Sequence, residues 1–174
     1  MMKAKKNLKQ AVQDYHLLDH KGRKIKFSSL FGKKEDLILI HNMGKACTYC
    51  TLWADGFNGV VPHLENRAAF AVVSPDPPEV QKKFYNSRNW KFKMYSTKGS
   101  FFAKDMGFES AKGGPQPGVS VFYKNKSGKI VRVAKDYFGP GDPYCGVWHL
   151  FDLLPGGPKG WHRSINIVES FADS

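Results

Sequence analysis

The sequence predicts an α/β protein with a mixed central sheet and helices on both faces. Two continuous apolar runs, at 37–41 and 69–74, are typical of strands that are covered on both sides. Each run is followed by a segment with helical spacing of its apolar residues, and such alternation favours a partly parallel sheet. The 174-residue chain is 41% hydrophobic, which suits one domain with a full core.

The N-terminal part is predicted to contain a basic leader and a small hairpin. Residues 1–13 are basic, and we expect a poorly anchored leader or a short helix there. The turn sequence Asp-His-Lys-Gly lies between 15–18 and 23–27, which predicts a hairpin. Ser28 is a candidate cap for a short helical turn that ends at Gly32.

The central part is predicted to be strand, helix, strand, helix. A helix is expected from about 48 to 65, although Gly56, Gly59 and Pro62 weaken it. After the second strand, Pro75-Asp76-Pro77-Pro78 opens a helix that extends to about 88.

The C-terminal half completes the pattern with shorter segments. We expect a strand at 93–96, a helical turn at 100–106, a Gly/Pro-rich loop at 113–118, a hairpin of 119–124 with 130–138, and a helix at 145–154. The predicted organisation is a leader (1–14), one domain (15–155) and a tail (156–174).

Charge and composition narrow the function classes. The net charge is +12, but the lysines are scattered and no zinc-finger spacing, aromatic RNA-binding motif or basic heptad region is present. We therefore expect no nucleic-acid partner. No apolar run approaches the ~20 residues that span a bilayer, and the N-terminus has no signal-peptide pattern. A cytoplasmic protein without a membrane partner is expected, and three cysteines do not suit a secreted disulfide scaffold.

The motif with the most chemical content is Cys47-Thr48-Tyr49-Cys50, between the first buried strand and its helix. A cysteine at a helix N-terminus faces unpaired backbone N–H groups and the positive end of the helix dipole. Both favour the thiolate, so the thiol pKa falls. A second thiol one turn later can resolve a mixed disulfide. The motif predicts a redox pair, with Cys47 as nucleophile and Cys50 as resolving thiol.

The order of elements around this motif resembles the thioredoxin fold, a three-layer sandwich. More narrowly, the stretch from Cys47 through Trp53-Ala54-Asp55-Gly56-Phe57 resembles a bacterial thioredoxin-like family of predicted dithiol–disulfide oxidoreductases, long catalogued as a domain of unknown function. Segments 117–122 and 151–155 also match that family. The resemblance covers about residues 15–155 and implies a disulfide substrate, an external thiol reductant and no cofactor.

Supporting roles follow from this resemblance and from position. His41 stands where thioredoxins have a buried carboxylate, so it is a candidate proton acceptor for Cys50, or else a hydrogen-bonded core histidine. Lys45 is a candidate for stabilising the thiolate, or is simply solvated. The resemblance implies a cis proline at Pro117. Trp53 and Asp55 belong to the family signature, with Trp53 expected in the core and Asp55 either paired or solvated.

Other interpretations use the same residues. The cysteines could be inert core residues. Cys145 and His149 are four residues apart and, with Cys47 and Cys50, would make a Cys₃His zinc set. Copper delivery through Cys47, Cys50 and a nearby His or Met is a variant of this interpretation. A basic binding protein with a vestigial pair is a third interpretation.

Two further expectations concern peroxide chemistry and assembly. The peroxiredoxin pattern Pro-x-x-x-Thr/Ser-x-x-Cys is absent, so dedicated peroxidase chemistry is not expected. Trp148 and Trp161 are candidates for a homodimer interface.

Overall fold

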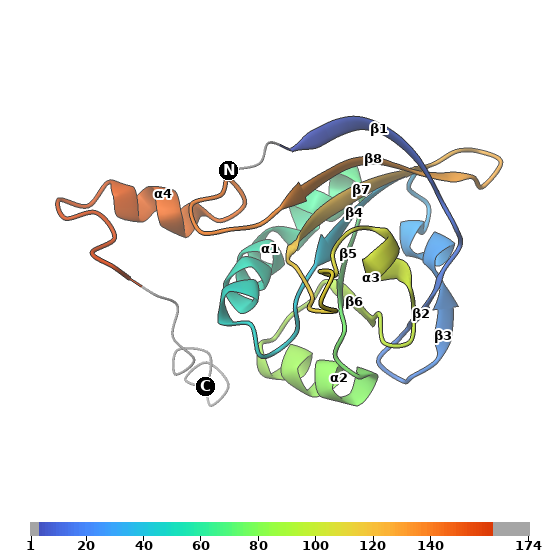
Figure 1. Cartoon of the computed structure of the whole chain (residues 1–174), viewed down its shortest axis with the longest axis horizontal. Coiled ribbons are helices and arrows are strands. Elements are labelled where there is room, and N and C mark those ends of the chain that lie inside the picture. Colours follow the sequence, from blue (N-terminus) through green and yellow to red (C-terminus); the bar gives the residue numbers. More distant parts are fainter. Residues whose placement is uncertain (1–3, 162–174) are drawn as a thin grey trace.

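The computed structural model describes residues 4–161, which fold around one eight-stranded sheet (Figure 1). The strand order is β1-β8-β7-β4-β5-β6-β2-β3. The strands are β1 (Lys5–Val12), β2 (His16–Leu18), β3 (Lys24–Lys26), β4 (Asp36–His41), β5 (Ala69–Ser74), β6 (Lys93–Ser96), β7 (Gly118–Lys124) and β8 (Ile130–Tyr137). The helices are η1 (Phe27–Phe31), α1 (Thr48–Arg67), α2 (Pro78–Ser87), α3 (Phe102–Asp105) and α4 (Gly146–Asp152).

The sheet is mixed, as the sequence predicts. Strands β4, β5 and β6 are parallel and are joined through α1 and α2, whereas β7 pairs antiparallel with β4 and β8. His41 lies opposite Val73 in β5 and Gly118 in β7. The carboxyl ends of β4, β5 and β6 therefore share one edge, which is where open α/β sheets place their ligands.

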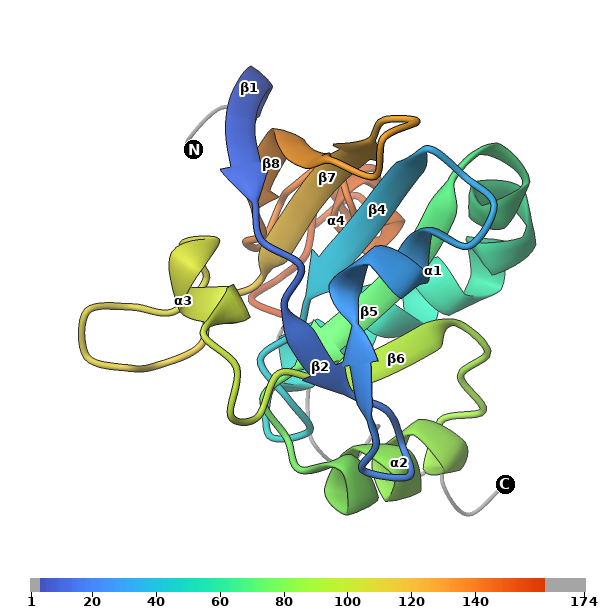
Figure 2. The ribbon, with the colours of Figure 1, turned by 90° about the vertical axis from the view of Figure 1, so that its right-hand side faces the viewer.

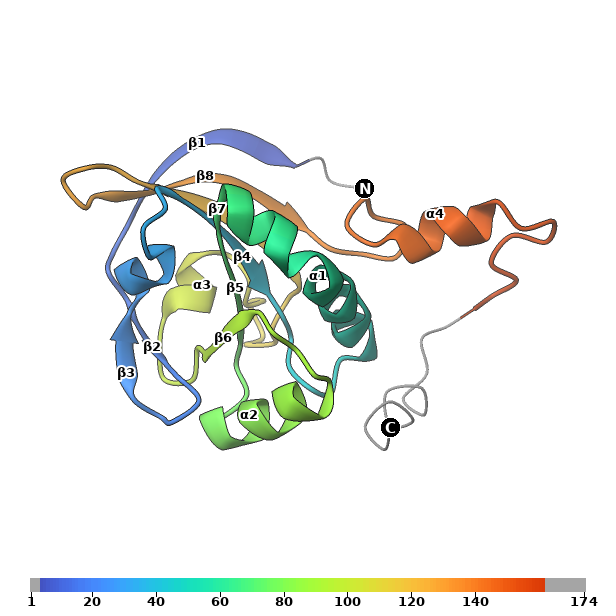
Figure 3. The same cartoon turned by 180° about the vertical axis from the view of Figure 1, so that it is seen from behind.

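Helices cover both faces of the sheet, which makes the predicted three-layer sandwich (Figure 2). Strand residues alternate between the faces. Leu37 and Leu39 of β4 pack in the core with η1 and α3. Ile38 and Ile40 belong instead to the core around Trp53, which includes side chains of α1 and α2. Figure 3 shows α1 on this face of the sheet. This alternation decides below which side chains of β4 can meet the cysteines.

The N-terminal segment differs from the expected leader or short helix. Residues 5–12 form β1, which pairs antiparallel with β8, from Val12 opposite Ile130 to Lys5 opposite Lys135. Alternate side chains at positions 8, 10 and 12 are half-buried. This period of two is the signature of a strand with one covered face, and the high lysine content obscures it.

Helix α1 is longer than its composition suggests. It continues through Gly56, Gly59 and Pro62 to Arg67. Tertiary burial of Trp53, Ala54 and Val61 outweighs the weak helix propensity of those residues.

Two helix boundaries also have clear local causes. Helix α2 begins at Pro78 and not at Pro75, because Pro77 precedes another proline and adopts an extended conformation. The helical turn predicted at 100–106 is limited to Phe102–Asp105.

Helix α4 projects from the body of the molecule and has no buried residue (Figures 1 and 3). Its inner side nevertheless meets the start of α1, where Trp148 lies 6.0 Å from Tyr49 between ring centroids. Within residues 4–161, no helix is both long and apolar enough to cross a membrane.

Candidate functional site

Cys47 occupies the N-cap position of α1. Its backbone is extended, and its Sγ accepts a hydrogen bond from the backbone N–H of Cys50 at 3.1 Å. Sulfur here takes the place of the Ser or Asp oxygen that usually caps a helix. The N–H groups of the first turn and the helix dipole therefore converge on the sulfur, as the motif predicts.

The two thiols are electrostatically different. Hydrogen bonding from the Cys50 thiol, followed by the backbone N–H groups of Cys50 and Tyr49, lowers the pKa of Cys47 to about 7. The same thiol–thiol contact, together with burial, raises the pKa of Cys50. Cys47 is half-buried, whereas Cys50 is 2% exposed. The accessible sulfur is thus the more acidic one, and both cysteines are free thiols.

The loop before Cys47 is held by Asn42 and Asp76. Asn42 accepts from the Gly44 N–H at 2.7 Å and donates to the Cys50 carbonyl at 3.4 Å. Asp76 accepts from the Lys45 N–H at 2.8 Å. Gly44 has φ +105°, and a Cβ there would lie 2.9 Å from the Asp76 carboxylate. Glycine is therefore required for this loop to reach its anchor.

Lys45 is positioned by its backbone rather than by its charge. Its side chain is exposed. The groups that lower the Cys47 pKa are Cys50 and two backbone N–H groups, and Lys45 is not one of them. The structure thus assigns the acidity to hydrogen bonds at the helix start, and the predicted contribution of the Lys45 charge is not among its causes.

His41 lies on the other face of the sheet from α1. It has the same parity in β4 as Leu37 and Leu39, so its ring stacks on Phe108 with centroids 3.7 Å apart. Its Nε2 lies 2.9 Å from the Ser120 Oγ. The structure does not bring His41 to the cysteines. The hydrogen bond to Cys50 that the predicted proton transfer requires is therefore not formed in this structure. Of the two predictions for His41, the geometry matches the buried core histidine.

Pro117 is trans, contrary to the expected cis bond, since residues 4–161 contain no cis peptide. The Gln116 N–H donates to the Phe108 carbonyl at 2.9 Å, and the Pro117 carbonyl accepts from the Phe138 N–H at 3.0 Å. These two hydrogen bonds hold the chain on either side of the trans peptide bond at the start of β7.

Trp53 and Asp55 fasten α1 to neighbouring elements. The Trp53 indole N–H donates to Asp142 at 3.3 Å. Asp55 accepts from the Trp90 indole at 2.9 Å and forms an ion pair with Arg88, whose side chain is 4% exposed. Of the two possibilities for Asp55, the structure shows the paired one. These signature residues hold the helix that carries the cysteines.

The alternative zinc set is not assembled. No group of three or more His, Cys, Asp or Glu side chains in residues 4–161 is placed to hold a metal ion. Cys145 is buried in the core around Trp53, and its predicted co-ligand His149 bonds instead to the Asp142 carbonyl at 2.9 Å. The Cys₃His prediction is therefore wrong for this structure, because Cys145 packs in the core and His149 bonds to the loop before α4.

The comparisons with known proteins begin with a family model. The model described as "Bacterial protein of unknown function (DUF899)" matches residues 7–170. The chain belongs to this family. The match takes in both the C-x-x-C motif and most of β1 of the DUF899 chain. Among curated proteins, none matches it significantly.

Solved structures similar to the DUF899 chain include thioredoxin-like proteins. Peroxidoxin BcpB from Mycobacterium tuberculosis is 23% identical, with a TM-score of 0.56 over 74% of this chain and 84% of that chain. A cysteine mutant of PrxQ from Xylella fastidiosa is 16% identical, with a TM-score of 0.60 over 78% and 89%. A hypothetical protein from Sinorhizobium meliloti is 14% identical, with a TM-score of 0.53 over 94% and 92%. These likenesses establish the thioredoxin-like fold.

Two parts of the site escape sequence reasoning. Asn42 and Asp76 hold the cysteine loop, and a pocket that Asn42 helps to line lies at the edge of the sheet. The sequence does contain a clue to both residues. Asn42 and Asp76 closely follow the two buried strands, and residues at the carboxyl ends of such strands often form sites. Trp148 and Trp161, the candidate dimer residues, pack on each other within one chain at 5.9 Å.

Proposed function

We propose that this protein is a thiol–disulfide oxidoreductase that uses Cys47 and Cys50. The observation that carries the proposal is the capping sulfur of Cys47, which accepts a backbone N–H at 3.1 Å and has a pKa of about 7. A thiol with that pKa is about half ionised at neutral pH and combines a large thiolate fraction with good nucleophilicity. The similarity to thioredoxin-like redox proteins supports the same class of chemistry.

The reaction proceeds by two exchanges. The Cys47 thiolate attacks one sulfur of a substrate disulfide, forms a mixed disulfide and releases the first substrate thiolate. Cys50 then loses its proton and attacks the Cys47 sulfur, which releases the second thiolate and leaves a Cys47–Cys50 disulfide. The substrate gains two electrons. An external thiol reductant returns those electrons to the protein and restores the dithiol.

The environment of Cys50 suits the resolving role. Its sulfur is buried and accepts from the Met43 N–H at 3.4 Å, which orients it at the start of the helix. Its raised pKa keeps it protonated while Cys47 is a thiolate. Once the mixed disulfide forms, the Cys47 anion is gone and the electrostatic cause of that raised pKa weakens.

The test is a titration of free thiols against a graded glutathione buffer. The wild type should show one reversible two-electron transition. Cys47→Ser and Cys50→Ser should each lose it, and the matched control Cys145→Ser should keep it. An absent transition in the wild type, or one that survives in Cys47→Ser, would refute the proposal. Metal measured in the same samples distinguishes thiols occupied by a metal from inert thiols.

A further inference from the structure

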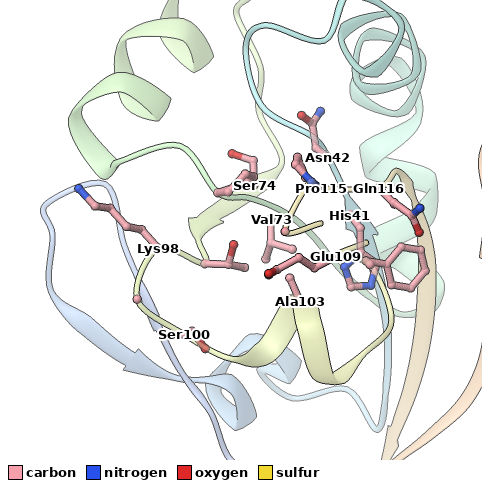
Figure 4. Close-up of a pocket in the computed structure, with 15 residues that line it drawn as sticks. His41, Asn42, Val73, Ser74, Lys98, Ser100, Ala103, Glu109, Pro115 and Gln116 are labelled. Carbon is pink, nitrogen blue, oxygen red and sulfur yellow. The ribbon is translucent and has the colours of Figure 1, made fainter. Parts of the chain in front are cut away.

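The strongest feature outside the dithiol is a pocket of about 300 Å³ at the carboxyl edge of β4 and β5 (Figure 4). Its lining includes His41 and Val73, which are buried, together with Ala103 and Phe108 from the α3 region. Neither Cys47 nor Cys50 lines it. The volume is at the lower end of the range for small-molecule sites. The pocket therefore needs an explanation separate from the dithiol.

His41 brings an unsatisfied polar atom to this pocket. The residue is 3% exposed, and its Nδ1 is buried with no hydrogen-bond partner. A buried polar atom without a partner is rare because it forfeits the hydrogen bond it would make in water. An atom of that kind in the wall of a cavity indicates a missing ligand atom.

A hydrogen-bond chain behind the ring decides what that ligand atom must be. The Arg132 guanidinium donates to the Ser120 Oγ at 3.3 Å, and Ser120 lies 2.9 Å from the His41 Nε2. Arginine only donates, so the Ser120 oxygen accepts from it, and in residues 4–161 the His41 Nε2 is the one acceptor within reach of the Ser120 hydroxyl hydrogen. Nε2 is then the accepting nitrogen, and Nδ1 carries the hydrogen. The ligand must supply an acceptor.

The buried charge behind the His41 ring is positive and belongs to Arg132. Arg132 is 4% exposed, and its hydrogen-bond acceptors are the neutral groups of Gln10, Ser120 and the Met106 carbonyl. Within residues 4–161, Arg132 forms no ion pair. Burial, followed by the charges of Arg132 and Lys135, holds the pKa of His41 well below its usual range, so the ring stays neutral. A buried cation without a carboxylate favours an anion nearby.

We infer that this pocket binds a small aliphatic carboxylate, whose oxygen accepts from the His41 Nδ1–H and whose alkyl part packs on Val73, Ala103 and Phe108. This site is additional to the dithiol and does not rest on the proposed redox function. A carboxylate provides the hydrogen-bond acceptor that the His41 Nδ1–H lacks. Its negative charge is also attracted by the buried positive charge of Arg132.

Two exposed charged residues, Lys98 and Glu109, also line the pocket. Figure 4 shows the Glu109 side chain directed toward Val73 and Ala103, and the Lys98 side chain directed away from them. Water screens exposed charges, so the Glu109 carboxylate repels an anionic ligand only weakly.

The test compares butyrate with its neutral isostere butyramide on the full chain. Binding is followed through the ring nitrogen signals of ¹⁵N-labelled histidines in long-range ¹H–¹⁵N NMR spectra. We expect butyrate to bind saturably, to shift the His41 Nδ1 signal, and to bind at least tenfold more tightly than butyramide. The wild-type spectrum should also show the Nδ1–H form of His41 before any ligand is added.

A matched pair of variants completes the design. His41→Phe keeps a ring that can stack on Phe108 and should lose butyrate binding, whereas His63→Phe, on the exposed side of α1, should keep it. Equal affinity for butyrate and butyramide would overturn the inference. The inference would also be overturned if butyrate did not shift the His41 signal of the wild-type protein. This second test does not need the His41→Phe variant, so it holds even if that variant fails to fold.

Discussion

At the scale of single residues, the acidity of Cys47 has a local and testable cause. Its pKa of about 7 predicts that iodoacetamide reacts with a rate that rises with pH around a midpoint near 7. The hydrogen bond from Cys50 is the largest contribution to that acidity. Cys50→Ala should therefore move the midpoint upward, and Cys50→Ser, which keeps a donor, should move it less. Equal midpoints in all three proteins would show that Cys50 has no such role.

His41 predicts a pH-dependent loss of stability. Its pKa lies well below the ordinary value of about 6.5, because burial and the nearby cations disfavour the charged ring. Below pH 6.5 the unfolded chain takes up a proton at this site that the folded chain does not, so stability falls as pH falls. The slope from this one group is at most about 1.4 kcal/mol per pH unit. Denaturant unfolding measures this slope. Between pH 7 and 5, the free energy of unfolding should fall more steeply for the wild type than for His41→Phe.

At the scale of elements, Asp55 joins α1 to the segment after α2. Asp55→Ala removes the carboxylate from Arg88, whose side chain is 4% exposed, and leaves the Trp90 indole without its acceptor. Removing the carboxylate from a buried ion pair costs several kcal/mol, and the partial exposure of Asp55 reduces this, so we expect a loss of about 2 kcal/mol. Urea unfolding measures it. The exposed pair Arg67–Asp36 is the control, and Arg67→Ala should cost less than about 1 kcal/mol.

Strand β1 contributes a side chain to the buried cation of the sheet. The Gln10 Oε1 accepts from the Arg132 Nε at 2.9 Å. Gln10→Ala should cost about 1–3 kcal/mol, the usual range for a hydrogen bond to a charged group whose partner stays buried. Lys9→Ala, one position along on the exposed side, should be close to neutral in the same thermal unfolding series. Equal effects at the two positions would mean that β1 is attached by its backbone alone.

At the scale of the whole molecule, α4 is peripheral to the folded sheet. A chain that ends at Cys145 loses a helix with no buried residue, so the hydrogen-exchange protection of β4 and β5 should remain. The Trp148 ring packs on Tyr49, with ring centroids 6.0 Å apart. Loss of Trp148 should therefore expose Tyr49 and raise the reactivity of Cys47 toward iodoacetamide. Loss of protection throughout the sheet would show that α4 is part of the cooperative core.

The sequence predicts the architecture well where periodicity and burial agree. The runs at 37–41 and 69–74 became β4 and β5, and the cysteine motif fell at the start of α1. The prediction failed where lysines mask a period of two, as in β1. It also failed where a role depends on contacts between distant segments. The parity of His41 in its strand and its link to Ser120, 79 residues away, are set by strand pairing that no local pattern encodes.

Tyr49, inside the C-x-x-C motif, lies between two tryptophans, with ring centroids 6.3 Å from Trp53 and 6.0 Å from Trp148. A disulfide quenches nearby indole fluorescence, and any shift of the Cys47–Cys50 loop alters both ring contacts. The proposed oxidation of the two thiols is therefore expected to change the tryptophan emission spectrum, so fluorescence would test for it in real time without a dye or a coupled enzyme.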